Sequence, residues 1–355
     1  MTTEILKIGM PSGSLADPKR GGSLVTLLEN SGFKTSGYET GGPSKFSTIN
    51  YLFGWDGRPQ EFGSQLGINE LDVAIAGNDW IKERILEFKI EYNTDIKLEN
   101  VLSLNRGNVK IVGIIKNEFS SQNAEEYLKL ICPGKDIITV VAEMPYLALD
   151  WVQNKLKNIG LSETYSSFSV QKYKSPARIK KGVVIYETWG KTEAKVKNEG
   201  ADLGIEITQS GSALKNYGLK IIDTLMESET SIWINPDLRK NKSKKDLLDM
   251  FLLNLNGTVN AENKVMVVFN VANSQINIIE KYLSDNKLFA DEPTMNVGKV
   301  FTEISIQVAK DDKNLPLAKI RYELAKLGAV NIDTIPVISS IKGLNVINSG
   351  SSGNH

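Results

Sequence analysis

The chain has 355 residues, of which 41% are hydrophobic, and it carries 42 basic and 42 acidic side chains. A chain of this length exceeds the size at which a single core stops growing, so we expect two or three domains. Because the charges balance, no overall positive field attracts nucleic acid, and we expect no nucleic-acid partner.

Apolar runs that end at polar or glycine-containing turns alternate with segments of helical spacing over the first two thirds of the chain. This alternation predicts a parallel α/β sheet, whose ligands would bind beyond the carboxyl ends of the strands. The predicted strands cover residues 5–10, 71–76, 109–115, 137–142, 183–187 and 203–208. The predicted helices cover residues 24–32, 80–88 and 147–159.

The last third of the chain follows a different order of elements. A helix is predicted over residues 242–255, ending in a turn at Asn256 and Gly257. Predicted strands and helices then alternate over residues 265–271, 276–283, 300–309, 317–327 and 332–338. The order β-α-β-β-α-β indicates a ferredoxin-like domain, with one strand unassigned near residues 293–297. Such domains often sense small ligands, although that link is an analogy.

The N-terminal sequence, the lack of long apolar stretches and the single cysteine indicate in which cellular compartment we expect the protein. Residues 1–10 lack the basic start and apolar run of a signal peptide, and no apolar stretch approaches the roughly 20 residues that span a bilayer. We therefore expect a cytoplasmic protein without membrane contact. The single cysteine, Cys132, cannot form an intramolecular disulfide, and its place beside Pro133-Gly134 favours an inert turn residue over a nucleophile.

The only histidine, His355, ends residues 348–355, a segment with the composition of a flexible linker or a purification-tag remnant. Without a positioned imidazole, serine-histidine-aspartate and cysteine-histidine catalysis are excluded, as is imidazole-bound zinc. Any metal should be hard and oxygen-bound, such as Mg²⁺.

The most informative segment is residues 200–219, in which a predicted strand bearing Asp202 and Glu206 ends in a polar loop. Glycine, hydroxyl groups and backbone amides before a helix suit a phosphate monoester. A carboxylate just upstream can accept hydrogen bonds from ribose hydroxyls or hold Mg²⁺. Taken alone, Ser210-Gly211-Ser212 also fits a plain turn with a capping serine.

The longer string resembles the phosphoribosyl-pyrophosphate loop of the ATP phosphoribosyltransferase family, which catalyses the first step of histidine biosynthesis. That loop usually has an alanine-aspartate pair, a second acid, threonine-glycine-threonine-threonine-leucine and asparagine-glycine-leucine. The matching residues here are Ala201-Asp202, Glu206, Ser210-Gly211-Ser212-Ala213-Leu214 and Tyr217-Gly218-Leu219.

Other motifs extend the resemblance over nearly the whole chain. Residues 71–83 are similar to the family's strand-turn-helix segment at the substrate cleft, and Trp189-Gly190-Lys191-Thr192-Glu193 is similar to its glycine-serine-x-glutamate stretch. Glu292-Pro293-Thr294 and Leu327-Gly328-Ala329 resemble signatures of the long form, which carries a histidine-sensing domain.

One departure concerns the nucleotide. Where the family usually has a proline-lysine-glycine-arginine loop, this chain has Pro11-Ser12-Gly13-Ser14, so two expected cations are missing. Lys19, Arg20 or Arg58 could supply the charge from another position, or they could be solvated surface residues. Glu292, where a small serine is common, puts the affinity for histidine in doubt.

The resemblance implies a reaction that joins N1 of ATP adenine to C1 of 5-phosphoribosyl-1-pyrophosphate and releases pyrophosphate with Mg²⁺. It implies that the sugar phosphate binds at Gln209, Ser210, Gly211, Ser212, Ala213 and Leu214, with Glu206 and Asp202 as catalytic acids and Glu206 as a metal ligand. The nucleotide would contact Ser12, Gly13, Arg20, Arg58, Gly77, Asp79 and Glu193. Histidine would inhibit by binding near Asn270, Thr294 and Ala329, and the family's long form assembles as a hexamer.

We therefore expect two periplasmic-binding-protein-like lobes with a cleft between them, plus the ferredoxin-like regulatory domain. Lobe I covers residues 1–107, completed by about 222–258, lobe II covers 108–221, and the regulatory domain covers 262–345. Two alternatives stay open: a paralogue that has lost catalysis, and a two-lobed solute-binding protein without chemistry. Asp79 could also simply cap the helix predicted from Trp80, and the basic residues 239–245 suit a solvated helix face.

Overall fold

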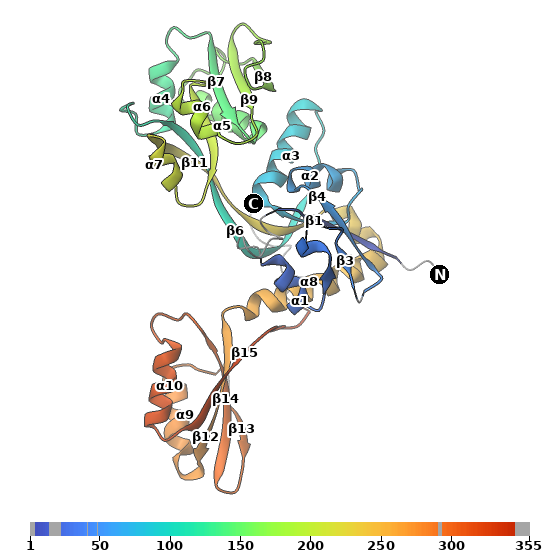
Figure 1. The fold of residues 1–355 in the computed structure, drawn as a ribbon, viewed down its shortest axis with the longest axis vertical. Helices are drawn as coiled ribbons and strands as arrows, with labels where there is room; N and C mark the ends of the chain where they lie inside the picture. The colour runs from blue at the N-terminus through green and yellow to red at the C-terminus, as the bar shows by residue number, and fades with distance from the viewer. Residues whose placement is uncertain (1–3, 14–22, 41, 48, 290–292, 345–355) are drawn as a thin grey trace. The chain divides into compact units, whose positions relative to one another are not determined.

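The computed structural model describes residues 4–13, 23–40, 42–47, 49–289 and 293–344 (Figure 1). The chain forms two compact units. The first comprises residues 1–23 and 35–248, and the second comprises residues 24–34 and 249–355. Within the described residues, no helix is both long enough and apolar enough to span a bilayer.

The first unit is organised by a nine-stranded sheet in the order β4-β1-β5-β11-β6-β10-β7-β9-β8. Its strands are β1 (Leu6–Pro11), β4 (Leu52–Gly57), β5 (Val73–Gly77), β6 (Glu99–Lys116), β7 (Ile137–Ala142), β8 (Phe168–Lys172), β9 (Gly182–Glu187), β10 (Leu203–Thr208) and β11 (Leu219–Ile234). Strands β4, β1 and β5 pair in parallel, and so do β10, β7, β9 and β8. These two groups are called the first and second half-sheets below.

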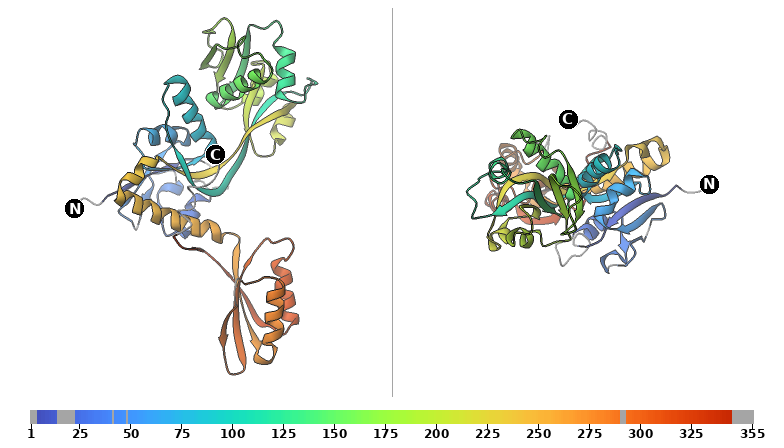
Figure 2. Two further views of the ribbon diagram at one scale, coloured as in Figure 1. Left: turned by 180° about the vertical axis from the view of Figure 1, so that it is seen from behind. Right: turned by 90° about the horizontal axis from the view of Figure 1, so that it is seen from above.

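Two long strands join the half-sheets, and they correct the expectation of an all-parallel sheet. β6 and β11 pair antiparallel to each other from Leu219 opposite Lys116 to Ile234 opposite Glu99, with several register shifts. β11 also pairs antiparallel with β5, and β6 pairs antiparallel with β10. Each long strand therefore belongs to both half-sheets, and the two run side by side in every view (Figure 2).

Helices cover the two half-sheets because their apolar residues recur at helical spacing. They are α2 (Pro59–Gly67), α3 (Asn78–Glu91), α4 (Ala124–Ile131), α5 (Pro145–Asn158), α6 (Thr192–Lys197) and α7 (Ser212–Asn216). The unit also contains the 3-10 turns η2 (Tyr38–Thr40) and η3 (Pro236–Lys240) and a two-stranded sheet of β2 (Thr35–Ser36) and β3 (Lys45–Phe46). Phe62 and Leu66 of α2 are buried against Ala74 and Ala76 of β5. Leu147, Trp151 and other residues of α5 pack in a second core with β7, β9 and β10.

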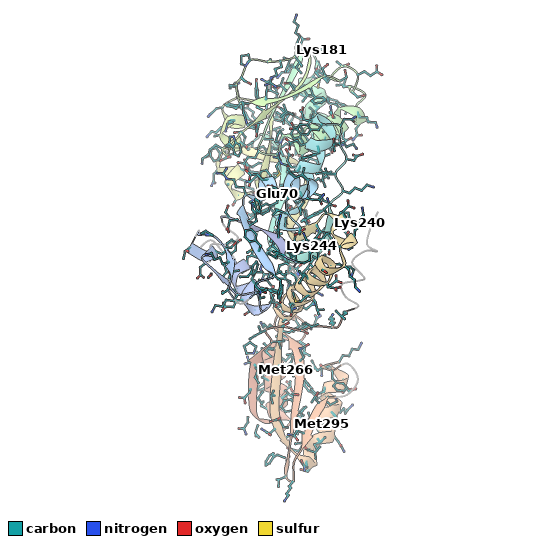
Figure 3. The ribbon with its side chains drawn as sticks, turned by 90° about the vertical axis from the view of Figure 1, so that its right-hand side faces the viewer. Glu70, Lys181, Lys240, Lys244, Met266 and Met295 are labelled. Atoms are coloured by element: carbon teal, nitrogen blue, oxygen red, sulfur yellow. The ribbon has the colours of Figure 1, made fainter. Side chains whose placement is uncertain are left out.

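The second unit contains the predicted ferredoxin-like fold. Its elements are β12 (Lys264–Ala272), α9 (Ile276–Asp285), β13 (Thr294–Val297), β14 (Phe301–Ala309), α10 (Leu317–Lys326) and β15 (Val330–Pro336), with the 3-10 turn η4 (Asn273–Gln275). The sheet order is β13-β14-β12-β15, and every pair is antiparallel. Strand β13, which carries Met295 opposite Ile304 of β14, is the strand that sequence left unassigned (Figure 3). The β-α-β-β-α-β expectation is confirmed.

The predicted turn at Asn256 and Gly257 is wrong, because α8 (Lys242–Ala261) continues through both residues. A Cβ at Gly257 would lie 2.5 Å from Ile341 Cγ1 and 2.6 Å from Ser339 Oγ, and the Ser340 amide donates a 2.7 Å hydrogen bond to the Gly257 carbonyl. The glycine therefore allows close approach of residues 339–341 rather than ending the helix.

Helix α1 (Leu24–Asn30) packs beside the C-terminal part of α8 within the second unit. Ser31 Oγ donates a 2.8 Å hydrogen bond to Thr258 Oγ1, and the ring centroids of Phe33 and Phe251 are 5.0 Å apart. The sequence far upstream of the ferredoxin-like fold thus contributes to the second unit.

The basic residues 239–245 lie mostly at the surface, as expected, with Arg239, Lys240 and Lys242 exposed, and three members of the segment form ion pairs. Lys244 Nζ lies 2.8 Å from Asp72 Oδ1, and Lys240 Nζ lies 2.7 Å from Asp237 Oδ1 (Figure 3). The Arg239 guanidinium pairs with the carboxylate of Glu99.

Candidate active site

The first unit contains a cavity of about 490 Å³, lined by both polar and apolar side chains, where the carboxyl ends of strands from both half-sheets meet. Five of the predicted site residues line it, namely Ser12, Arg58, Gly77, Asp79 and Gln209. The wall also includes Gln60, Trp80, Gly107, Val109, Trp189, Ile207, Ser228 and Thr230, which the sequence analysis did not select. Residues from widely separated parts of the chain therefore share one candidate site.

The loop after β10 has the conformation expected for a tight polar turn. Gly211 adopts a φ of 72°, which favours glycine, and its amide donates a 2.9 Å hydrogen bond to Thr208 Oγ1. The Ser210 and Ser212 hydroxyl oxygens are exposed and lie 2.8 Å apart. The predicted helix after the loop is α7, five residues long.

Two predicted contacts of this loop differ in exposure. Ala213 is exposed, whereas Leu214 is buried in the core formed by Val196, Leu219 and their neighbours. Leu214 therefore anchors the loop to the second half-sheet, and the hydroxyls of Ser210 and Ser212 are the groups left to meet a ligand.

Glu206 lies in an acidic environment. Its Oε1 accepts a 2.9 Å hydrogen bond from the Ile207 amide, and its Oε2 is buried with no hydrogen-bond donor among the described residues. Burial raises the pKa of Glu206 to about 7, and the nearby carboxylates of Glu193 and Glu143 add to the shift.

Glu143, which follows β7 directly, is a member of this acidic group that sequence reasoning missed. Burial also raises its pKa, partly offset by a hydrogen bond from the Gly190 amide. Glu143, Glu193 and Glu206 come from three separate segments at the carboxyl ends of the second half-sheet. No group of three or more acidic, cysteine or histidine side chains among the described residues is arranged to hold a metal ion by itself.

Asp79 is not the cap of α3, which corrects that alternative. The helix begins at Asn78 after the N-cap residue Gly77, so Asp79 lies within its first turn. The carboxylate leans over Gly77, where a Cβ would lie 2.3 Å from Asp79 Oδ1, and that oxygen accepts a 2.9 Å hydrogen bond from the Trp80 amide. Asp79 is 4% exposed, and burial raises its pKa.

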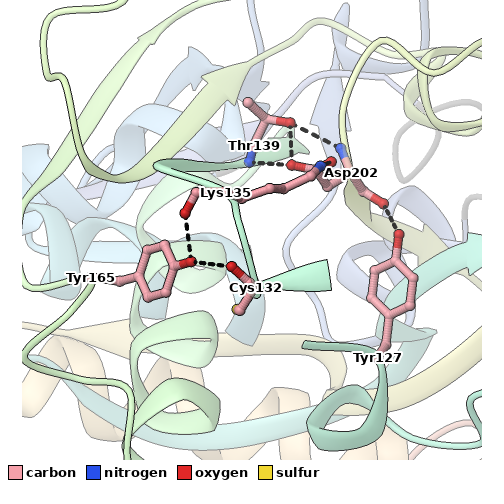
Figure 4. Close-up of polar contacts among 6 residues, drawn as sticks. All are labelled: Tyr127, Cys132, Lys135, Thr139, Tyr165 and Asp202. Atoms are coloured by element: carbon pink, nitrogen blue, oxygen red, sulfur yellow. Dashed lines mark hydrogen bonds and ion pairs between the residues drawn. The ribbon is translucent and has the colours of Figure 1, made fainter. Parts of the chain in front are cut away.

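Asp202 immediately precedes β10 and is not among the residues that line the cavity. Figure 4 shows its contacts with Thr139 and Lys135. A six-residue strand spans roughly 20 Å, so its carboxylate is far from the loop at Thr208. Its Oδ2 accepts hydrogen bonds of 2.8 Å from the Thr139 amide and 2.9 Å from Thr139 Oγ1, and Oδ1 pairs with Lys135. Asp202 therefore ties β10 to β7, and we do not include it in the candidate site.

Of the remaining residues predicted to contact the nucleotide, the structure describes Ser12, Gly13, Arg58 and Glu193. The Ser12 amide donates a 3.0 Å hydrogen bond to the Gly57 carbonyl, and Gly13 has a φ of 98°. Arg58 is exposed at the N-cap of α2, without a side-chain capping bond. Glu193 lies in the first turn of α6, near Glu206 rather than on the cavity wall. Arg20, Lys19 and Glu292 lie outside the described residues.

The three predicted histidine contacts do not converge within this chain. Asn270 of β12 pairs with Val330, the residue after Ala329, so these two lie close together. Thr294 is on the edge strand β13, with β14 between it and β12. Asn270 also faces away from the helices, because Phe269 and Val271 form the core, whereas Ala329 is inside that core.

The sheet topology and the cavity define the class of protein to which this chain belongs. Two parallel half-sheets joined by paired long strands, with a cavity at the strand ends, form two periplasmic-binding-protein-like lobes, and a ferredoxin-like domain follows them. The family model described as "HisG: ATP phosphoribosyltransferase" matches residues 58–257, more than half of the chain. The chain belongs to the ATP phosphoribosyltransferase family, the pentosyltransferases of the first step of histidine biosynthesis, which use ATP and phosphoribosyl pyrophosphate and depend on a metal ion.

Relatives of the same name match most of the chain. The ATP phosphoribosyltransferase of Desulfosudis oleivorans is 26% identical over 287 residues, covering 79% of this chain and 82% of that protein. That of Geotalea daltonii is 26% identical over 346 residues, covering 94% and 98%. Among solved structures, the ATP phosphoribosyl transferase (HisG:HisZ) complex from Thermotoga maritima aligns with 72% of this chain and 99% of its own, with 16% identity and a TM-score of 0.49.

Proposed function

We propose that the cavity lined by Arg58, Asp79 and Gln209 is where this chain joins N1 of ATP adenine to C1 of 5-phosphoribosyl-1-pyrophosphate and releases pyrophosphate. The observation that carries this proposal is that four residues predicted to contact the nucleotide, Ser12, Arg58, Gly77 and Asp79, line one cavity together with Gln209, the first residue of the predicted phosphate loop. Displacement at the anomeric carbon needs both substrates held in line within reach of each other, which a shared cavity provides.

The 5-phosphate binds at the loop after β10 in this proposal. The Ser210 and Ser212 hydroxyls donate hydrogen bonds to the phosphate oxygens, and Gly211 lets the backbone approach closely. Gln209 lines the cavity, Ala213 is exposed, and Leu214 anchors the loop in the core of the second half-sheet. The exposure of both hydroxyls supports this assignment.

Glu206 accepts hydrogen bonds from the ribose hydroxyls or contacts Mg²⁺. Its buried Oε2 without a donor supports either role, since such an oxygen gains most from a ligand donor or a cation. Mg²⁺ typically keeps several waters and takes one or two carboxylates plus substrate phosphates, which fits one partly satisfied carboxylate better than a preformed cage. Bound Mg²⁺ would stabilise charge on the departing pyrophosphate.

ATP occupies the part of the cavity bounded by the first half-sheet. Ser12, Gly13 and Gly77 offer backbone close to the ligand, and the exposed Arg58 guanidinium suits the triphosphate. Arg20 is proposed to add positive charge, replacing the family's missing lysine and arginine. Asp79 on the cavity wall and Glu193 beside Glu206 are the proposed acidic contacts of the nucleotide. No side-chain base is needed, because adenine N1 is already a nucleophile and the sugar reacts through an oxocarbenium-like state that positioning and charge stabilise.

We propose further that histidine inhibits the enzyme through Asn270, Thr294 and Ala329 of the second unit. Thr294 lies apart from Asn270 and Ala329 within one chain. A second subunit would therefore have to supply the missing contacts with histidine, which suits the hexamer of the family's long form. Feedback then requires two states that bind histidine unequally. A cytoplasmic location is proposed from the biosynthetic role of the family.

The test is pyrophosphate release by the purified full chain with ATP, Mg²⁺ and phosphoribosyl pyrophosphate. Ser210→Ala should raise the KM for the sugar substrate, Arg58→Ala should raise the KM for ATP, and Arg321→Ala, an exposed cation on α10, should change neither. Added histidine should slow wild type. Both substrates binding without pyrophosphate release would favour the paralogue that has lost catalysis, and binding of an unrelated solute instead would favour the solute-binding protein.

A further inference from the structure

Trp189 is the tryptophan that the fold leaves unpacked. It is 74% exposed, whereas Trp151 is 7% exposed and Trp55, Trp80 and Trp233 are half-buried against core residues. An indole buries a large apolar area when it finds a partner, so leaving one in water forgoes a substantial gain. Because Trp189 forms part of a cavity wall, its exposed ring is available to a ligand that enters the cavity.

The backbone on both sides of this indole is held in place. The Thr188 amide donates a 3.0 Å hydrogen bond to the Ala142 carbonyl, and the Thr188 hydroxyl donates one of 3.2 Å to the Gly190 carbonyl. Lys195 Nζ adds a 2.7 Å hydrogen bond to the same carbonyl. The exposed ring therefore extends from a fixed turn, which lowers the entropy lost when it contacts a ligand.

The surroundings of the ring suit a flat aromatic group. Trp189 lines the cavity together with the apolar side chains of Val109 and Ile207 and with Gln209 of the phosphate loop. Lys172 Nζ lies 5.9 Å from the ring centroid, over one face of the indole. A single ammonium covers only one face, so the opposite face is left for a second stacking partner.

We propose that Trp189 stacks on the adenine ring of ATP and so determines where the base lies. This inference rests on the proposed function. Phosphoribosyl pyrophosphate has no aromatic ring, so of the two substrates only ATP offers a π surface. Because adenine N1 must reach C1 of a sugar whose phosphate is held beside Gln209, a stacking residue in the same cavity serves the reaction geometry directly.

Two variants of Trp189 separate stacking from a structural effect. Trp189→Ala should raise the KM for ATP about 10- to 100-fold, the range for loss of one base stack, and leave the KM for phosphoribosyl pyrophosphate within about twofold. Trp189→Phe keeps a stacking ring and should restore most of the affinity for ATP. Because the indole is mostly exposed, both variants should unfold at the wild-type temperature.

Tryptophan fluorescence gives a readout that does not depend on turnover. Because Trp80 also lines the cavity, the comparison is made in chains that carry Trp80→Phe. Titration of Trp80→Phe with ATP and Mg²⁺, without the sugar substrate, should quench its fluorescence. Adding Trp55→Phe, a change outside the cavity, should keep this quenching, whereas adding Trp189→Phe should nearly abolish it. Inorganic tripolyphosphate, which lacks a base, should bind wild type and Trp189→Ala equally.

The outcomes distinguish this inference from the proposed function. Equal quenching of Trp80→Phe with and without Trp189→Phe, no quenching of Trp80→Phe, or a Trp189→Ala variant whose KM rises for the sugar substrate instead of ATP would each overturn the stacking assignment. Quenching that depends on Trp189 in a chain that releases no pyrophosphate would support the adenine site and contradict the proposed reaction.

Discussion

Glu83 of α3 and Leu147 of α5 are joined by a 2.7 Å hydrogen bond from the Leu147 amide to Glu83 Oε2. The other carboxylate oxygen, Oε1, accepts a 3.0 Å hydrogen bond from the Tyr146 amide. Glu83 is fully buried, and it satisfies two amides at the start of α5 that have no partner within their own helix. Glu83 therefore caps α5, although the two are more than 60 residues apart in sequence. The same contact ties α5 to α3, whose first turn lines the cavity.

Replacing Glu83 with glutamine should destabilise the first unit by about 2–3 kcal/mol, because the amide nitrogen would face a buried backbone donor and leave it unsatisfied. Urea unfolding followed by tryptophan fluorescence reports on this unit, since all five tryptophans precede residue 249. Glu163→Gln, on an exposed turn, is the matched control and should change the free energy of unfolding by less than about 0.5 kcal/mol. Equal stabilities of the two variants would contradict the capping role.

The same residue should make stability depend on pH. Burial raises the pKa of Glu83 from 4.5 in the unfolded chain to about 7 in the folded chain. Between these two pH values, the folded chain therefore keeps a proton on Glu83 that the unfolded chain has released. The stabilisation from this group is fully present below about pH 4.5 and is lost as the pH rises through about 7. The difference in unfolding free energy between wild type and Glu83→Gln should therefore be larger at pH 5 than at pH 8, and a difference that grows with pH would refute this.

Activity should respond to ionisation of Glu206. Its pKa is raised to about 7, first by burial and then by Glu193 and Glu143, so kcat/KM should increase with pH through about 7 if the carboxylate form binds ribose. Glu193→Gln removes one neighbouring negative charge and should move the inflection to lower pH. Glu163→Gln should leave the pH profile of wild type unaltered, and an inflection that stays in place in Glu193→Gln would rule out the coupling.

Gly211 should be sensitive to substitution because of its backbone conformation. Alanine at a φ of 72° costs about 1 kcal/mol, and its Cβ would lie 3.3 Å from Ile221 Cδ1, so the loop should shift. We expect the KM for phosphoribosyl pyrophosphate to rise about tenfold in Gly211→Ala while the KM for ATP stays constant. Gly218→Ala has a similar φ of 69° and open space around it, and serves as the control for strain away from the phosphate loop. Similar KM values for both variants would count against the loop's role.

Cys132 should be an inert thiol, as sequence reasoning expected. It is 5% exposed, and burial raises its pKa, which lowers the thiolate fraction at neutral pH. A chromogenic disulfide reagent should label less than a tenth of the native chain in the time that denatured chain reacts fully, with one thiol per chain. Rapid labelling of native protein would contradict the buried placement.

The sequence predicted elements whose signals are local. Residues 137–142 and 203–208 match β7 and β10 to the residue, because each is a short apolar run bounded by turns. β6 and β11 were largely missed, since each passes through two half-sheets and exposes different faces along its length, so neither shows one simple apolar pattern. Gly257 resembled a helix stop, and only the packing of residues 339–341 explains it as part of a helix.

The site was predictable in part for the same reason. The sequence analysis assigned Asp202 to the ligand because it precedes the phosphate loop in the family motif. A comparison with a second aspartate, Asp72, indicates instead that Asp202 has a structural role. Asp72 stands at the start of β5 as Asp202 stands at the start of β10, and its Oδ2 accepts a 2.8 Å hydrogen bond from the Lys7 amide of the neighbouring strand. Glu143 and Glu83 act through contacts more than 45 residues away in sequence, which no local pattern encodes.

A crystal structure of the full chain with phosphoribosyl pyrophosphate and Mg²⁺ would test the proposed phosphate site most directly. We expect the 5-phosphate to lie beside Ser210 and Ser212, with the ribose hydroxyls or the metal ion at Glu206. The anomeric carbon should face the cavity that Asp79 and Trp189 line. A sugar phosphate bound elsewhere on the chain, with the turn around Gly211 empty, would contradict this expectation.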